Sequence, residues 1–275
     1  MVARRRVDAE LVRRGLVSSR SEAQAAVRAG RVLVRGAPAT KATTLVGADD
    51  PLALTRPARP YVSRGGEKLA AALDAFAVDP GNRDALDAGA STGGFTDCLL
   101  QRGARRVAAV DVGHGQLAWE LRTDPRVVVL ERTNVRELTS QELPFVPTVV
   151  VGDLSFISLR LVSEPLIRLA ADGADVILLV KPQFEAGRDR VGGGGVVRDP
   201  EVWREAVEGV AEALRDAGAG PRGVLVSPIT GPAGNVEFLV HARVDDWRAN
   251  DEVRDRSGGL DVDGAVRSAM ELAGR

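Results

Sequence analysis

The sequence has few of the residues that build disulfide, metal or membrane-spanning structures. Its 275 residues include one cysteine, Cys98, which excludes an internal disulfide and a cysteine-based zinc cluster. The two histidines, His114 and His241, are too isolated to suggest a metal site, so no metal is expected. No apolar run approaches the roughly 20 residues of a membrane helix, and Asp8 and Glu10 stand where a signal peptide needs an apolar stretch. These absences favour a cytoplasmic protein that does not enter a membrane.

Lysine is almost absent as well. Of the 37 basic residues 34 are arginine, and the three lysines are Lys41, Lys68 and Lys181. In a chain so rich in arginine, a position that needs only positive charge is usually filled by arginine. Lysine differs because its ammonium group can lose a proton, which a guanidinium group effectively cannot do. Composition therefore nominates the three lysines as candidates for chemistry.

The net charge of −1 conceals an uneven distribution. Residues 1–60 carry twelve basic and five acidic side chains, a net charge of +7, and the remaining residues carry a net charge of −8. This asymmetry predicts a basic module that attracts a polyanion, joined to a body with a different purpose. The alternative is a solvated basic face without a partner.

The basic module has the sequence pattern of a small α/β domain. Val7, Leu11 and Val12 lie at helical spacing and predict a first helix. Ser19 and Glu22 form an S-x-x-E capping box, which predicts a second helix over residues 20–29. A strand is expected over 31–35. Arginines recur along these segments, enough to line a phosphate-binding surface.

Prolines separate this module from the rest of the chain. Pro51, Pro57 and Pro60 mark an extended connector. The prediction is a first domain over residues 1–55, a linker over 56–62 and a second domain over 63–275. Beyond it, short apolar runs alternate with helical stretches, a pattern typical of a mostly parallel sheet with crossover helices. The predicted strands cover residues 85–87, 107–111, 127–130, 148–153, 176–180, 224–227 and 238–244.

The ends of these strands carry the candidate site. Ligands of such sheets bind at the carboxyl ends of the strands, where Asp87, Asp111, Asp153 and Lys181 stand. The first strand runs into a glycine-rich turn, residues 89–94, that allows close backbone approach of a ligand. Its G-x-x-x-G-G spacing is not the G-x-G-x-x-G of dinucleotide enzymes, so no pyrophosphate need be bound. Taken alone, the glycine-rich turn could also be explained by packing without a ligand.

Asp111 strengthens the ligand interpretation. It ends the second strand 22 residues after Gly89, where a carboxylate can accept both ribose hydroxyls of a nucleoside. A glycine turn combined with this acid fits adenosine without phosphates and suggests S-adenosylmethionine. Asn134, after the third strand, is placed to meet the adenine; a surface loop is the alternative there.

Several stretches also carry a family resemblance. The N-terminal stretches RVDAEL, SSRSEA and AGRVLVRG resemble the S-four RNA-binding domain, and the large domain resembles FtsJ-type ribose methyltransferases. The whole chain resembles the TlyA (haemolysin A-like) family of rRNA 2′-O-methyltransferases. The matching stretches of the large domain are YVSRGGEKL, LDAGASTGGFT, DVGHGQL, GDLSFIS, LVKPQFE and GPAGNVE.

The resemblance implies a fold and an activity. The fold is a Rossmann-like class I methyltransferase sheet with a small N-terminal α/β RNA-binding domain. The activity is S-adenosylmethionine-dependent methylation of cytidine 2′-hydroxyls in 16S or 23S rRNA, or both, by a monomer acting on ribosomal subunits. The stretches leave two other classes open: a catalytically silent RNA-binding assembly factor and a membrane-lytic haemolysin, although no strongly amphipathic basic helix is evident.

The resemblance also implies which residues do the work. The family's catalytic tetrad falls on Lys68, Asp153, Lys181 and Glu237, with Lys181 as the base or hydroxyl-positioning group. The cofactor-binding residues it implies are Asp87, Gly89, Ser91, Thr92, Gly93, Gly94, Phe95, Asp111, Asn134 and Asp153. The implied RNA-binding residues are Arg4, Arg6, Arg20, Arg28 and Arg64.

Overall fold

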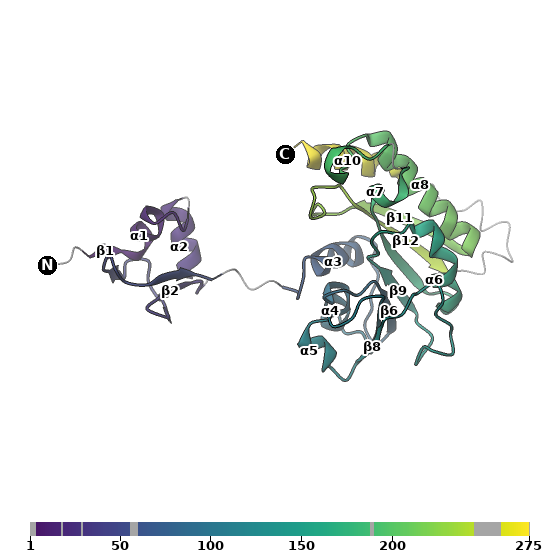
Figure 1. Cartoon of the computed structure of the whole chain (residues 1–275), viewed down its shortest axis with the longest axis horizontal. Coiled ribbons are helices and arrows are strands. Elements are labelled where there is room, and N and C mark those ends of the chain that lie inside the picture. Colours follow the sequence, from purple (N-terminus) through teal and green to yellow (C-terminus); the bar gives the residue numbers. More distant parts are fainter. Residues whose placement is uncertain are drawn as a thin grey trace. The chain divides into compact units, whose positions relative to one another are not determined.

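The computed structural model describes residues 4–17, 19–28, 30–55, 60–187, 190–244 and 260–274. They form two compact units that divide between Arg59 and Pro60 (Figure 1). This division falls inside the segment predicted as a connector, of which residues 56–59 lie outside the described residues. Within the described ranges, no helix combines the length and the apolar character needed to cross a membrane.

The first unit is a small α/β domain, as the sequence predicted. Helices α1 (Val7–Arg13) and α2 (Arg20–Arg28) accompany a two-stranded sheet, β1–β4, and a three-stranded sheet of order β3–β2–β5. The predicted helix cap is present, because Ser19 Oγ accepts a hydrogen bond from the Glu22 amide at 3.2 Å. The strands are β1 (Arg5–Arg6), β2 (Val32–Val34), β3 (Ala37–Pro38), β4 (Leu45–Val46) and β5 (Leu52–Leu54).

The second unit is built on one seven-stranded sheet of order β11-β12-β10-β9-β6-β7-β8. All seven predicted strands of the large domain belong to it. Strand β12 pairs antiparallel with both its neighbours, and the other pairs are parallel. The strands are β6 (Asp84–Ala88), β7 (Arg106–Asp111), β8 (Val127–Glu131), β9 (Val149–Gly152), β10 (Asp175–Val180), β11 (Ala219–Val226) and β12 (Phe238–Val244).

The strand order places the binding edge of the sheet. From β6 the chain first proceeds outward to β7 and β8, and it later returns to the other side of β6 to form β9 and β10. Neighbouring crossovers therefore leave in opposite directions at the carboxyl end of β6. Such a switch point is where ligands bind in open α/β sheets.

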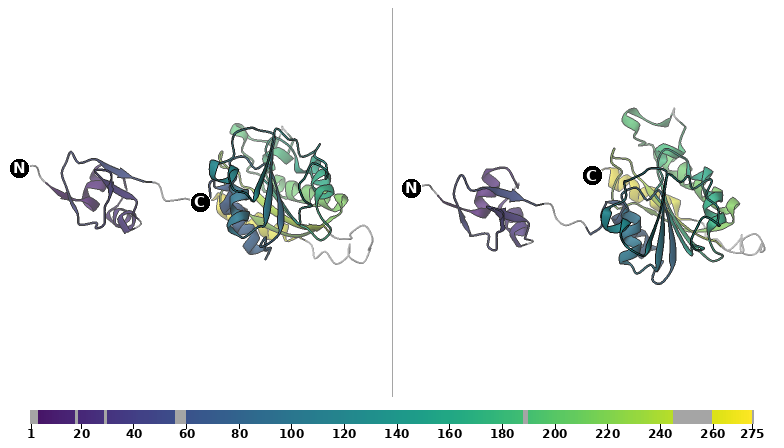
Figure 2. Two further views of the ribbon diagram at one scale, coloured as in Figure 1. Left: turned by 90° about the horizontal axis from the view of Figure 1, so that it is seen from below. Right: turned by 60° about the horizontal axis from the view of Figure 1, so that its bottom comes forward.

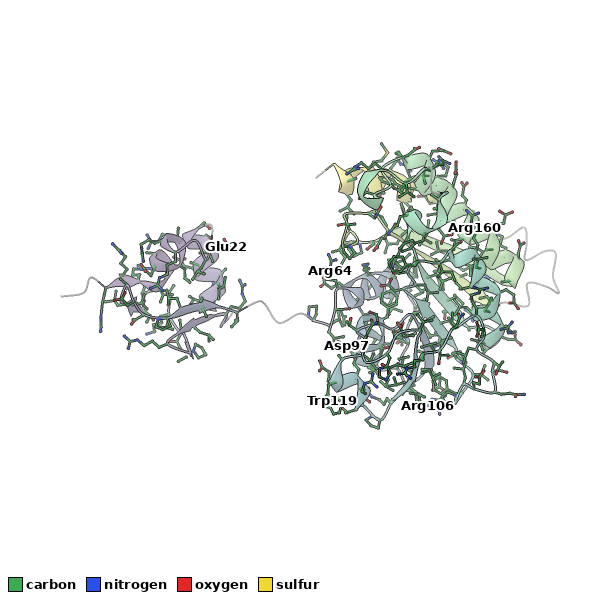
Figure 3. All side chains as sticks on the ribbon, in the orientation of Figure 1. Glu22, Arg64, Asp97, Arg106, Trp119 and Arg160 are labelled. Carbon is green, nitrogen blue, oxygen red and sulfur yellow. The ribbon has the colours of Figure 1, made fainter. Side chains whose placement is uncertain are left out.

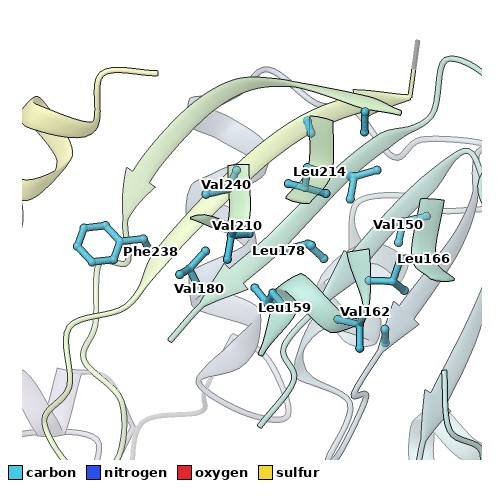
Figure 4. Close-up of a cluster of buried hydrophobic side chains, with 14 of the residues drawn as sticks. Val150, Leu159, Val162, Leu166, Leu178, Val180, Val210, Leu214, Phe238 and Val240 are labelled. Atoms are coloured by element: carbon cyan, nitrogen blue, oxygen red, sulfur yellow. The ribbon is translucent and has the colours of Figure 1, made fainter. Parts of the chain in front are cut away.

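Helices cover both faces of this sheet (Figure 2). Because side chains alternate along a strand, Leu178 and Val180 of β10 join one apolar cluster, and Leu179 joins the other. Figure 4 shows the first cluster, where these β10 side chains meet Val210 and Leu214 of α8. Burying each such side chain stabilises the fold by about 1.5–3 kcal/mol. The sheet is therefore a rigid support for groups at its edge.

The first cluster receives helices from the second half of the chain, and the other receives helices from the first half. The helices are α3 (Gly65–Ala75), α4 (Gly94–Gln101), α5 (Trp119–Arg122), α6 (Ser163–Leu169), α7 (Pro182–Glu185), α8 (Pro200–Ala217) and α10 (Val262–Ala273), with short 3-10 turns η1 (Leu159–Leu161) and η3 (Gly193–Gly195).

Candidate active site

The glycine turn joins β6 to α4 across the ends of the neighbouring strands. The Gly89 amide donates to Val110 O at 2.8 Å, and the Asp153 amide donates to Ala88 O at 3.1 Å. Gly89 has a φ of +82°, and a Cβ there would lie 2.8 Å from the Asp153 carbonyl oxygen. A residue without a side chain is therefore needed for β6 to end this close to the segment after β9.

A cavity of about 470 Å³ lies beside this turn, at the ends of β7 and β9. Its volume is within the range of about 300–1,000 Å³ that is usual for small-molecule sites. The wall is partly apolar, with Val110, Val135, Ile157 and Val162. Polar side chains that also line it come from Ser91, Asp111, Gln116, Thr133, Asn134, Asp153 and Ser155.

Asp111 is fixed at the cavity by its own backbone surroundings. Its Oδ2 accepts a hydrogen bond from the Ser91 amide at 2.8 Å, and its Oδ1 accepts one from the Gly113 amide at 2.7 Å. Each carboxylate oxygen can accept more than one hydrogen bond. The carboxylate is thus held in one orientation and keeps acceptor capacity for a ligand.

The structure brings five of the ten predicted cofactor residues to the cavity: Gly89, Ser91, Asp111, Asn134 and Asp153. The other five, Asp87, Thr92, Gly93, Gly94 and Phe95, do not line it. The turn that follows β6 therefore contributes some residues to the cavity wall and others to the packing behind it.

Asp87 stabilises the glycine turn by linking the strand before it to the helix after it. It lies within β6, one residue before the strand ends, and is fully buried. Its Oδ2 accepts a hydrogen bond from Thr96 Oγ1 at 2.6 Å, which ties β6 to α4. Burial raises the pKa of the Asp87 carboxyl to about 7, and the nearby Asp153 carboxylate acts in the same direction.

Gly93 and Gly94 are required by packing, and neither lines the cavity. A Cβ on Gly93, whose φ is +96°, would lie 2.2 Å from Leu121 Cδ1. A Cβ on Gly94 would lie 2.1 Å from Ser63 Oγ and 3.0 Å from the Gly66 amide nitrogen. A side chain at these two positions would therefore collide with α5 and with the start of α3, and contact of the turn's backbone with a ligand stays a prediction.

The four residues of the predicted tetrad form two ion pairs. Lys68 on α3 places its Nζ 2.5 Å from Glu237 Oε2, just before β12, and both residues are buried. Lys181, directly after β10, places its Nζ 2.6 Å from Asp153 Oδ1, directly after β9. Each lysine is thus paired with a carboxylate contributed by a different segment.

Lys181 has a further partner that the sequence did not suggest. Its Nζ donates a hydrogen bond to Ser155 Oγ at 2.8 Å, and the Phe184 ring centre lies 6.0 Å from the same nitrogen. Asp153 and Ser155 both line the cavity. The amine is therefore held beside the cavity.

Sequence reasoning also missed Gln116 and Phe156. Gln116 lines the cavity, and its Oε1 accepts a hydrogen bond from Ser91 Oγ at 3.3 Å. The Phe156 ring is 92% exposed at the cavity and lies 5.2 Å from the ring of Phe184. Its φ of +64° is unusual for a bulky residue. An aromatic residue just after a strand end, in a chain with 4% aromatic residues, was the available signal.

The arginines predicted to bind RNA lie in both units. In the first unit Arg6 and Arg20 share the buried carboxylate of Asp8, with NH2 to Oδ2 distances of 2.8 and 3.4 Å. Arg4 and Arg28 are exposed. In the second unit Arg64 is exposed at the start of α3, one turn before Lys68 (Figure 3). Asp8 thus orients two of the arginines and offsets part of their charge.

The sheet order, the single antiparallel strand and the cavity beside a glycine turn define a Rossmann-like methyltransferase. The FtsJ-like methyltransferase family model matches residues 61–244, and the S4 domain model matches residues 5–52. The chain belongs to the FtsJ-like methyltransferases and, within them, to the TlyA family.

Relatives of known name cover nearly the whole chain. The 16S/23S rRNA (cytidine-2′-O)-methyltransferase TlyA of Mycobacterium tuberculosis is 52% identical over 90% of this chain and 93% of its own length. Hemolysin A of Brachyspira hyodysenteriae is 38% identical over 86% of this chain and 98% of its own length. A solved structure described as a "putative hemolysin" from Streptococcus thermophilus has a TM-score of 0.72 and 38% identity, over 98% of this chain and 97% of that one.

Proposed function

We propose that this protein transfers a methyl group from S-adenosylmethionine to the ribose 2′-hydroxyl of a cytidine in rRNA. The observation that carries the proposal is the Lys181–Asp153 ion pair, 2.6 Å long, beside a cavity at the switch point of a methyltransferase sheet. The TlyA relative that is 52% identical is named for the same reaction. Methylation of both 16S and 23S rRNA is part of the proposal.

The cavity fits the nucleoside part of S-adenosylmethionine. Asp111 offers two acceptor oxygens, which suit a pair of ribose hydroxyls. Asn134 and Gln116 supply amide groups for the adenine edge, between apolar walls that suit its ring. When bound, the cofactor supplies a methyl group on a positively charged sulfur, which makes that carbon open to attack by an oxygen.

The two ion pairs suit attack by a ribose hydroxyl. A 2′-hydroxyl is a weak acid, so its oxygen attacks well only if its proton is removed as the new C–O bond forms. Lys181 Nζ takes this proton once it is a neutral amine, and Asp153 holds the nitrogen in place. Lys68 and Glu237 form a second buried pair that holds α3 against the start of β12. A base-methylating enzyme would not need this arrangement.

Features of both units suit an RNA substrate. The exposed ring of Phe156 offers a face on which a nucleobase can stack, as aromatic side chains do in RNA recognition. Arg64 is exposed at the start of α3, and its positive charge suits a phosphate. The S4 domain with its arginines Arg4, Arg6, Arg20 and Arg28 supplies further phosphate contacts. We propose that these groups bind rRNA in cytoplasmic ribosomal subunits.

The test is to locate the methyl group. Ribosomal subunits lacking the modification are incubated with the protein and S-adenosylmethionine, and their rRNA is digested to nucleosides for mass spectrometry. We expect 2′-O-methylcytidine and alkali resistance of the adjoining phosphodiester. A methyl group on a base would contradict the proposal. Tight RNA binding without turnover would instead support an RNA-binding assembly factor.

Removing residues 1–60 is expected to weaken binding to ribosomal subunits while leaving S-adenosylmethionine affinity unchanged. The first unit has a core of its own, so its loss leaves the methyltransferase sheet intact. Affinity of the full chain should fall as salt rises, with a steeper slope than that of the truncated chain, because each phosphate contact releases condensed counterions. Binding measured at several salt concentrations checks this. Equal slopes, or full activity of the truncated chain, would show that the first unit does not contribute to RNA binding.

A further inference from the structure

Ser155 contacts the proposed base directly but is not part of the tetrad. It lies in the segment that follows β9, between Asp153 and Phe156, and lines the cofactor cavity. Its Oγ accepts a hydrogen bond from Lys181 Nζ at 2.8 Å. A hydroxyl in this position can control where the lysine nitrogen points.

The bonding of a neutral amine shows how neighbouring oxygens direct its lone pair. A neutral lysine nitrogen has a bond to Cε, two N–H bonds and one lone pair, arranged as a tetrahedron. Ser155 Oγ at 2.8 Å accepts one N–H bond, whereas Asp153 Oδ1, 2.6 Å from the nitrogen, is an ion-pair partner that accepts no hydrogen bond from the residues that the structure describes. Because the Ser155 bond fixes one N–H and the Asp153 carboxylate occupies a second side of the nitrogen, the lone pair is directed away from both oxygens.

Asp153 alone would leave this direction open. The amine could then exchange its N–H bonds and its lone pair by rotation about the Cε–Nζ bond, and the long lysine side chain could shift. The Phe184 ring, 6.0 Å from the nitrogen, offers no comparable fixed acceptor. Ser155 removes this freedom from a residue that must meet a hydroxyl in one geometry.

We infer that Ser155 is a positioning residue that, together with Asp153, directs the Lys181 lone pair at the ribose hydroxyl. The inference rests on the proposed function. During transfer the oxygen forms a bond to the methyl carbon, the sulfur retains the electron pair of the broken S–C bond, and the hydroxyl proton moves to Lys181 Nζ. Ser155 keeps its acceptor role before and after this step.

Ser155→Ala is expected to lower kcat by about tenfold or more, because small errors in the placement of a reacting group are costly. The KM for S-adenosylmethionine should stay within about twofold, since the Asp111 contacts are unchanged. The midpoint of the pH profile of kcat should move to lower pH, because the variant loses an acceptor that favours the charged ammonium. Ser155→Thr keeps the hydroxyl and should restore both kcat and the midpoint.

Ser158→Ala is the matched control. It removes a hydroxyl from the same segment, but Ser158 Oγ donates to Glu185 Oε2 at 2.6 Å and does not contact Lys181. We expect the pH midpoint of this variant to equal that of the wild type. An unchanged midpoint in Ser155→Ala, or an equal loss of kcat in Ser158→Ala, would overturn the inference. If the wild-type product carries the methyl group on a base, the proposed function fails instead, which nucleoside analysis decides separately.

Discussion

Lys181→Arg is expected to lose two to four orders of magnitude in turnover, roughly the contribution of a positioned acid–base group. Arginine keeps the positive charge and can still pair with Asp153, so RNA and cofactor binding should persist. Its guanidinium cannot be deprotonated in a protein, so it cannot take the hydroxyl proton. Methyl transfer to ribosomal subunits gives the rate, and calorimetry with S-adenosylmethionine gives the cofactor affinity.

Two further variants make this result specific. Lys41→Arg is the matched control, because Lys41 belongs to the first unit and this exchange also preserves charge; its turnover should be unchanged. Lys181→Ala should be as inactive as Lys181→Arg, since both lack a proton acceptor. Near wild-type turnover of Lys181→Arg would exclude Lys181 as the base.

Asp111→Ala is expected to weaken S-adenosylmethionine binding by about 1.5–3 kcal/mol, the scale of hydrogen bonds to a charged group. This corresponds to a roughly 10- to 150-fold rise in Kd. The variant removes the acceptor that we propose for the ribose hydroxyls, and it also releases the Ser91 and Gly113 amides that the carboxylate holds. Isothermal titration calorimetry measures the effect.

Asp124→Ala supplies the comparison for this variant. Asp124 precedes β8 in the same half of the sheet, pairs with Arg126 at 2.7 Å and does not line the cavity. Its loss should leave the Kd unchanged. Thermal denaturation shows whether both proteins are folded. If they are, equal cofactor affinity in the wild type and Asp111→Ala would mean that the cofactor's ribose binds elsewhere.

Much of the fold followed from local pattern. The strands were predicted because apolar runs such as residues 176–180 are short, rich in Val, Ile and Leu, and buried on both faces of a parallel sheet. Their limits were predicted less well. Strand β6 extends one residue beyond Asp87 in the structure, so this carboxylate belongs to the strand and pairs with Thr96. A backbone hydrogen-bond ladder sets where a strand ends, and the hydrophobic pattern records it only approximately.

The candidate site divides in the same way. Asp111, Asp153 and Lys181 could be found because each stands where an apolar strand ends, and the carboxyl ends of parallel strands meet at one edge. Lys68 and Glu237, which are 169 positions apart, were placed in one site through family resemblance, and their pairing with each other was not predicted. Spacing carries no information about such a contact, because the path of the chain between the two residues is not fixed by either of them.

By itself the sequence determined a basic module, a mostly parallel sheet and the residues at the carboxyl edge of that sheet, since these follow from charge, periodicity and strand ends. Only the tertiary structure decided which of those residues face the cavity. Gly93 and Asp111 were both predicted to bind the cofactor, yet Asp111 lines the cavity and a side chain on Gly93 would meet Leu121. The direction of a side chain depends on the helices that pack around it, and these come from other parts of the chain.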